Sequence, residues 1–325
     1  MNDAHLKYSK DLDETIVKAI ENDLKVKIIS VAKIITGEFN YSYKIITDKG
    51  SVIARVFRER NSPEDGKLEW IEKKLTEHNI PQAKTLFLTR EDKFFPYGYM
   101  VQEFVEGKNG FDSIMDGDIT FEEYFNKLAP LLQKVHQISV QGYGSIHTGK
   151  GEFKTFYASK LNFIKKLRKR MEKFNDVNPS IHEAILKVVE KLKNYEHLFK
   201  PVLVHGDPPP GNGIITKSGE LILIDWDNAG SGIWITEYAG LTYRGAYMWQ
   251  HKLSEEERNE IIKRSFRNYY TDVNFDDLDL LEVVRLLQIL TAYHSLAVHY
   301  FQHEDLKLYN IAKKRLTKML KSFES

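Results

Sequence analysis

The stretch that decides the fold is residues 202–227, VLVHGDPPPGNGIITKSGELILIDWD. It contains two short apolar runs rich in β-branched residues, 213–216 and 221–224, separated by the turn-forming Lys-Ser-Gly at 217–219. Short strand-like runs on either side of a glycine turn predict a β-hairpin.

The register of this hairpin brings two polar side chains together. If Thr216 pairs near Glu220, counting outward in antiparallel register sets Asn212 almost opposite Ile224, beside Asp225. An amide oxygen and a carboxylate then meet at the open end of the hairpin.

A loop that carries a further carboxylate precedes the hairpin. His-Gly-Asp at 205–207 enters a segment that three prolines hold away from regular structure, so Asp207 projects near the same end. Asn212 and Asp225 are oxygen ligands that suit Mg²⁺ together with waters and phosphate oxygens. Asp207 can then accept a proton from an attacking hydroxyl. Base, amide ligand and carboxylate ligand in this order form the catalytic half of a kinase-type phosphoryl-transfer site.

The pattern H-G-D-x-x-x-x-N followed by I-D-W-D resembles the aminoglycoside phosphotransferase and choline kinase-like family, small-molecule kinases with a protein-kinase-like fold. The alternative is that Asp207 and Asn212 are turn residues and that Asp225 and Asp227 cap a strand end. The resemblance implies an α+β, bilobal fold with ATP and Mg²⁺ between the lobes. The N-terminal lobe, residues 1–106, would hold an antiparallel sheet, and the C-terminal lobe, 107–325, would be mainly helical and carry the catalytic hairpin.

The N-terminal lobe is expected to bind the nucleotide. An amphipathic helix at 12–24 precedes several strand-like runs, and Arg55 lies within the apolar run 52–57, where an unpaired cation would be costly. The resemblance implies that Arg55, where lysine is usual, binds the α- and β-phosphates and pairs with Glu69 of a following helix. The alternative is a surface arginine on an edge strand.

Two other segments complete the expected nucleotide site. The loop 37–44 matches the family's nucleotide-covering loop, with Asn40 and Ser42 as polar groups that could touch phosphate, although an ordinary hairpin loop is the alternative. The resemblance also implies that backbone groups around Glu103, Phe104 and Val105 form the hinge and hydrogen-bond the adenine ring.

Composition narrows the functional classes. The 325 residues carry 47 basic and 46 acidic side chains, and this balance argues against a nucleic-acid partner. There is no cysteine, which excludes disulfides and thiolate sites and fits a cytoplasmic protein. We expect no signal peptide, no apolar run of bilayer length and no membrane partner. The oligomeric state is left open.

The acceptor is the least determined part. A small molecule with a hydroxyl group is expected, with an aminoglycoside-type antibiotic as the leading candidate. Its positive charge would require carboxylates, and the sequence leaves open whether a C-terminal set faces the substrate: Glu255, Asp276, Asp277 and Asp279. A serine/threonine protein kinase of the same fold is one alternative. The other is a catalytically idle nucleotide-binding regulator, because Arg55, Pro209 and Glu237 depart from the family pattern.

Three side chains outside the central stretch receive structural expectations. The resemblance implies that Glu237, where aspartate is usual, stabilises the catalytic loop. His136, at the end of a predicted helix, is expected to be a packed structural residue. Ser254 and Glu257 have the spacing of a helix capping box.

Overall fold

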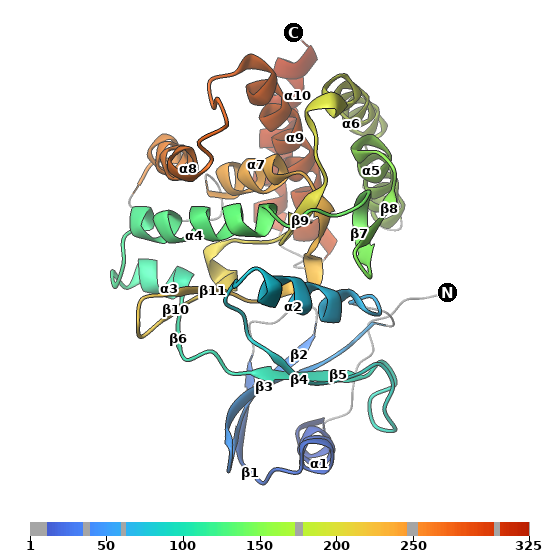
Figure 1. Ribbon diagram of the computed structural model, residues 1–325. Coiled ribbons are helices and arrows are strands. Elements are labelled where there is room, and N and C mark those ends of the chain that lie inside the picture. Colours follow the sequence, from blue (N-terminus) through green and yellow to red (C-terminus); the bar gives the residue numbers. More distant parts are fainter. Residues whose placement is uncertain are drawn as a thin grey trace. The chain divides into compact units, whose positions relative to one another are not determined.

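The computed structural model describes residues 12–34, 40–59, 63–172, 178–245, 253–301 and 306–324 (Figure 1). Contacts divide the chain into two compact units. The first unit comprises residues 1–109 and 212–228, and the second comprises 110–211 and 229–325. This division differs from the expected boundaries of 1–106 and 107–325, because it groups the central hairpin with the first unit.

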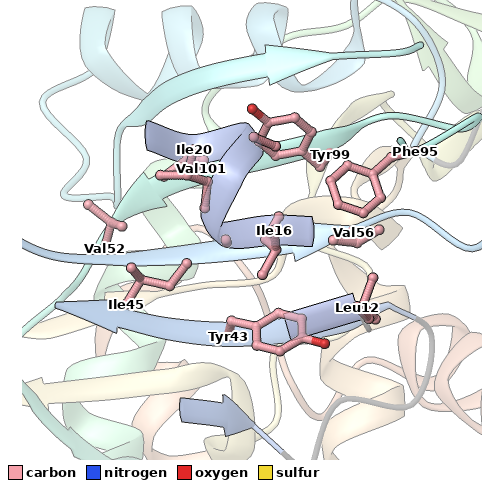
Figure 2. Packing of buried hydrophobic residues seen from close by; sticks show 12 residues of the cluster. Leu12, Ile16, Ile20, Tyr43, Ile45, Val52, Val56, Phe95, Tyr99 and Val101 are labelled. Carbon is pink, nitrogen blue, oxygen red and sulfur yellow. The ribbon is translucent and has the colours of Figure 1, made fainter. Parts of the chain in front are cut away.

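The first unit is built on an antiparallel five-stranded sheet of order β1-β2-β3-β5-β4. The strands are β1 (Ile28–Ile34), β2 (Tyr41–Thr47), β3 (Gly50–Val56), β4 (Thr85–Thr89) and β5 (Tyr99–Glu103). Helix α1 (Leu12–Leu24) packs its apolar side against one face. Figure 2 shows Ile16 and Ile20 of this helix over Tyr43, Val56 and Tyr99 of the sheet. The sheet and the opening helix confirm the expected N-terminal architecture.

Strand alternation directs Arg55 away from this core. Its neighbours Ala54 and Val56 are fully buried in the cluster under α1. Because successive side chains of a strand point to opposite faces, Arg55 lies on the other face of the sheet. Ser42 is its cross-strand partner on β2.

A second, three-stranded sheet contains the central hairpin. Strands β10 (Gly213–Thr216) and β11 (Leu221–Leu223) pair antiparallel, and β10 also pairs with β6 (Gly107–Asn109). Gly107 is required there, because a Cβ would lie 2.3 Å from the carbonyl oxygen of Ile215. The pairing with β6 explains why the hairpin groups with the N-terminal residues rather than with the helices.

The second unit is mainly helical, as expected (Figure 1). Its helices are α3 (Gly110–Met115), α4 (Phe121–His136), α5 (Phe156–Glu172), α6 (Pro179–Leu192), α7 (Trp234–Gly245), α8 (Glu255–Tyr269), α9 (Leu278–Phe301) and α10 (Leu306–Glu324), with a 3-10 turn η1 (Lys193–Leu198). A four-stranded sheet of order β8-β7-β12-β9 consists of β7 (Tyr143–His147), β8 (Lys150–Phe153), β9 (Val202–Val204) and β12 (Gly230–Gly232). The capping box predicted for Ser254 and Glu257 is present at the start of α8.

Helix α9 is the core helix of the second unit. Its segment Leu278–Val298 is long and apolar enough to cross a membrane by length and composition, which the sequence analysis did not expect. However, 56% of that segment is buried inside the protein, and Glu282 near its start forms an ion pair with Lys191 of α6. A buried core helix can also be long and apolar enough to meet these criteria, and the packing contacts of α9 are those of a buried core helix.

Candidate active site

The open end of the hairpin has the predicted register. Thr216 donates its N–H to the Glu220 carbonyl at 2.9 Å, and Ile224 donates to the Asn212 carbonyl at 2.9 Å. Asn212 therefore lies opposite Ile224, next to Asp225. Asp225 has φ +65°, a left-handed conformation that aspartate tolerates better than most residues, and it turns the chain from β11 into the 3-10 turn η3 (Trp226–Asn228).

Arg55 binds both aspartates of the I-D-W-D motif. Its Nη1 donates to Asp227 Oδ1 at 3.1 Å and its Nη2 to Asp227 Oδ2 at 2.5 Å, which is a two-point contact. Nη2 also donates to Asp225 Oδ1 at 3.1 Å. The arginine needed a partner because its side chain is only 12% exposed, and these two carboxylates provide it.

This pairing corrects the expected role of Glu69. Helix α2 (Lys67–Glu77) carries Glu69, but the Glu69 side chain is 56% exposed and makes a long 3.9 Å ion pair with Arg90. The periodicity of α2 explains the difference, since its buried face consists of Lys67, Leu68, Ile71 and Leu75 and does not include Glu69.

Asp227 has further partners in the first unit that the sequence analysis missed. Asn40 donates its side-chain amide to Asp227 Oδ2 at 3.3 Å. Lys67 is 4% exposed and donates from Nζ to the Asp227 backbone carbonyl at 2.6 Å and to Glu64 at 3.1 Å. The sequence did contain a signal for Lys67. It lies four residues before Ile71, on the apolar face of a helix, where an unpaired cation would be costly.

Electrostatics keep Arg55 charged. Burial works against the guanidinium charge, but the charges of Asp227 and Asp225 and their hydrogen bonds outweigh it and raise the pKa of Arg55 above its ordinary value. Burial is also the main influence on Asp227, whose pKa it raises, with the Asp225 charge acting in the same direction and Arg55 opposing both. The guanidinium therefore permits two carboxylates to lie side by side in a partly buried place.

The other expected nucleotide-binding residues occupy the first unit in several settings. Ser42 lies opposite Arg55 on β2, so it shares the face of the sheet that presents the guanidinium. Asn40 is buried against Asp227 as described, while residues 37–39 of the same loop lie outside the described residues.

The predicted hinge begins where β5 ends. The N–H of Glu103 donates to the Lys84 carbonyl at 2.9 Å, so this amide is engaged within the sheet. The ring of Phe104 lies 3.9 Å from Nζ of Lys44 of β2. Val105 follows in an irregular segment before β6.

Asp207 belongs to the second unit, in the loop that leaves β9. Gly206 has φ +84°, which glycine adopts without strain, and its N–H donates to Glu237 Oε1 at 2.7 Å. The Asp207 N–H donates to Nδ1 of the fully buried His205 at 3.4 Å. The loop before Asp207 is thus fixed by backbone hydrogen bonds to buried side chains.

A buried hydrogen-bonded chain holds Glu237 in turn. His136 Nε2 lies 2.5 Å from Glu237 Oε2 and therefore donates to it, since a carboxylate only accepts. His136 Nδ1 lies 2.5 Å from the Tyr270 hydroxyl. Burial raises the pKa of Tyr270 well above its ordinary value, so the phenol stays protonated. His136 is a packed residue, as expected, and it orients the carboxylate that binds the loop before Asp207.

The chemistry of the ligand set fits a magnesium ion bound with phosphates. Within the described residues, no group of three or more His, Cys, Asp or Glu side chains could hold a metal ion. Asn212 and Asp225 offer hard oxygen ligands only, and Mg²⁺ usually takes one or two protein carboxylates and completes its shell with phosphate and water oxygens. Asn212 and Asp225 would therefore suffice as the protein ligands of such an ion.

Comparisons with known proteins decide the family. Residues 31–275 match the model of a family described as the phosphotransferase enzyme family. The chain belongs to the phosphotransferase enzyme family. It is a phosphotransferase that acts on hydroxyl groups. Among curated proteins, no sequence matches it.

Solved structures of several kinases have a similar fold. An aminoglycoside phosphotransferase APH(4)-Ia, a thermostable mutant in its apo form, is 15% identical with a TM-score of 0.68, over 94% of this chain and 98% of that one. The choline kinase LicA from Streptococcus pneumoniae is 18% identical with a TM-score of 0.67, over 96% and 100%. A putative fructosamine-3-kinase from Haemophilus somnus 129PT is 14% identical with a TM-score of 0.65, over 94% and 96%. These likenesses confirm the protein-kinase-like fold.

Proposed function

We propose that this phosphotransferase moves the γ-phosphoryl group of ATP, in the presence of Mg²⁺, to a hydroxyl group of a small molecule. The observation that carries the proposal is the hairpin end, where the register sets Asn212 beside Asp225 and where Arg55 supplies a cation to the same place. Two oxygen ligands and an arginine are the groups that a nucleotide triphosphate with its metal ion requires.

The chain's own residues have separate roles in this proposal. Asn212 and Asp225 would hold Mg²⁺, which neutralises phosphate charge when it is bound. Arg55 binds phosphate oxygens, and Ser42 and Asn40 add polar groups near them. Asp207 orients the acceptor hydroxyl and takes its proton. Catalysis then depends mostly on positioning and on charge neutralisation.

The similar structures support a small acceptor without choosing one. An APH(4)-Ia mutant was solved in a ternary complex with AMP-PNP and hygromycin B, and the other two proteins are named for choline and fructosamine. All three names point to a small molecule as the acceptor, but the three molecules differ in their chemistry. An aminoglycoside remains the first compound to test.

The acidic residues of the second unit do not strengthen the aminoglycoside choice. Glu255 pairs with Arg315 at 2.7 Å, and Asp276 pairs with Lys263 and Arg267. Asp277 accepts two backbone N–H groups at the start of α9, where Asp279 lies in the first turn. Basic side chains and helix N–H groups therefore satisfy most of this set, so it offers little unpaired negative charge for a cationic acceptor.

The decisive experiment measures phosphoryl transfer from Mg-ATP to separate pools of aminoglycosides, amino alcohols, sugars and a generic protein. Transfer confined to one small-molecule pool is the expected result and identifies the acceptor class. Transfer to the protein alone would support a protein kinase instead. ATP binding with no transfer to any pool would support a regulator.

The Asp207→Asn variant tests the assignment of the base. The amide cannot accept the hydroxyl proton, so transfer should fall by about 100-fold or more, whereas nucleotide affinity should change little. Asp272→Asn, at an exposed position of the second unit, serves as the matched control. Equal loss of transfer and nucleotide binding in Asp207→Asn would contradict the assigned role.

A further inference from the structure

We propose that Asp227 is the positioning residue that holds Arg55 in place for the nucleotide phosphates, and that Arg55 shares Asp225 with the metal ion. This inference rests on the proposed function. It assigns to the second aspartate of the hairpin the orienting task that the family resemblance gives to a glutamate of α2.

The contacts of Arg55 are unequal. Asp227 receives a two-point contact from Nη1 and Nη2, at 3.1 Å and 2.5 Å, whereas Asp225 receives a single hydrogen bond at 3.1 Å. The Asp227 side chain is 16% exposed and that of Asp225 is 42% exposed. Two-point pairing fixes the plane of a guanidinium, and burial strengthens the pairing. Asp227 is therefore the anchor, and Asp225 is the partner that can be exchanged.

Asp227 is itself held by the first unit. Lys67 binds its carbonyl at 2.6 Å, and Asn40 binds its carboxylate at 3.3 Å. Lys67 is 4% exposed and is paired with Glu64, so it is fixed in turn. Asp227 is thus held through its backbone carbonyl by Lys67 and through its carboxylate by Asn40, and this support gives Arg55 a defined direction, as outer-layer partners do for metal ligands.

The single bond to Asp225 links the arginine to the metal site. When a divalent cation takes the Asp225 carboxylate, Nη2 loses one hydrogen bond, but the two-point contact with Asp227 remains. Nη2 would then be available to a phosphate oxygen. In the nucleotide-free protein, Arg55 competes with the cation for Asp225, because both positive charges are attracted to the same carboxylate.

The first test compares nucleotide affinity of Asp227→Asn and Glu69→Gln, measured with a fluorescent ATP analogue and Mg²⁺. Removing a supporting partner typically costs about 10–100-fold, so Asp227→Asn should bind at least about tenfold more weakly. Glu69→Gln should stay within about twofold, since its exposed ion pair contributes little. A larger loss in Glu69→Gln than in Asp227→Asn would overturn the inference.

A double-mutant cycle distinguishes positioning from general structural damage. If Asp227 acts through Arg55, adding Asp227→Asn to Arg55→Gln should cause no further loss of nucleotide affinity. Additive losses would show that Asp227 acts independently of Arg55, and the inference would fail. Wild-type protein that binds no Mg-nucleotide would refute the proposed function itself, which is a separate outcome.

A measurement without nucleotide covers the case in which Asp227→Asn does not fold. Manganese serves as a spectroscopic probe, and electron paramagnetic resonance reports free Mn²⁺ in a titration of the nucleotide-free protein. Arg55→Gln should bind Mn²⁺ more tightly than wild type, because the competing guanidinium is gone. Equal or weaker Mn²⁺ binding by Arg55→Gln would show that Arg55 and the metal do not share Asp225.

Discussion

At the scale of single residues, Glu237 shows how one buried carboxylate fixes the loop that carries Asp207. Its two oxygens bind the N–H of Gly206 and the ring of His136, and the residue is 3% exposed. The family pattern has aspartate here, and the longer arm of glutamate still reaches the loop backbone. The loop that presents Asp207 therefore depends on a side chain 31 positions beyond Gly206.

We expect Glu237→Ala to destabilise the protein by about 1–3 kcal/mol, because it leaves a donor of Gly206 and one of His136 unsatisfied. Phosphoryl transfer should fall at the same time, since the loop before Asp207 loses its anchor. Urea unfolding and transfer assays measure the two effects. Glu183→Ala, at an exposed position of α6, is the control and should change neither. An unaltered transfer rate in Glu237→Ala would contradict the role of the anchor.

At the scale of elements, the start of α8 was predictable because a capping box is a local pattern. The Ser254 hydroxyl accepts the N–H of Glu257 at 3.2 Å, and Glu257 accepts the N–H of Ser254 at 2.7 Å. Hydrogen bonding from Ser254 lowers the pKa of Glu257 from its ordinary value of 4.5. The same arrangement of Thr120 and Glu123 begins α4.

Ser254→Ala should lower the free energy of unfolding by about 1 kcal/mol at neutral pH, because the Glu257 N–H loses its acceptor. The contribution of Glu257 has a defined pH dependence. Since its folded pKa is lowered, its stabilising effect is complete above pH 4.5 and is lost as the pH falls through the folded value. Comparing wild type with Glu257→Gln from neutral to acidic pH measures this. A difference between the two that does not shrink on acidification would contradict the assignment.

The hairpin register and the Ser254–Glu257 capping box follow from patterns a few residues long. The need of Arg55 for a partner follows from the cost of burying a charge. The identity of the partner of Arg55 does not follow from any local pattern. Asp227 lies 172 positions away, and the pairing of β10 with β6 joins the hairpin to the first unit. Glu69 pairs with Arg90 instead of Arg55, and the helical pattern of α2 alone does not select one of its three glutamates as the partner of an arginine. Lys67 was missed because a lysine in a helix is ordinarily solvated.

At the scale of the whole molecule, α9 organises the second unit. It contacts α5, α6, α7 and α10, and Val283, Leu286 and Ile289 are essentially inaccessible to solvent. Leu278, at its start, is 80% exposed. Because most of its apolar middle is buried and only its start is exposed, α9 derives its stability from packing against neighbouring helices.

Leu286→Ala should therefore destabilise the protein by about 2–5 kcal/mol, the cost of a cavity in a packed core. Leu278→Ala should change stability by less than about 0.5 kcal/mol, because its side chain is already in water. Thermal unfolding in the absence of detergent measures both variants. A greater loss in Leu278→Ala would indicate that the apolar start of α9 is covered by a partner.

The division of the first unit between two distant stretches also has a consequence for synthesis. Residues 12–109 leave the ribosome about a hundred residues before the β10–β11 hairpin, so Arg55 is made long before Asp225 and Asp227. Until then, β6 lacks its partner strand β10, and the Arg55 side chain lacks the carboxylates that pair with it. The N-terminal sheet and α1 can form early from local contacts, but Arg55 becomes fixed only when residue 227 has been translated.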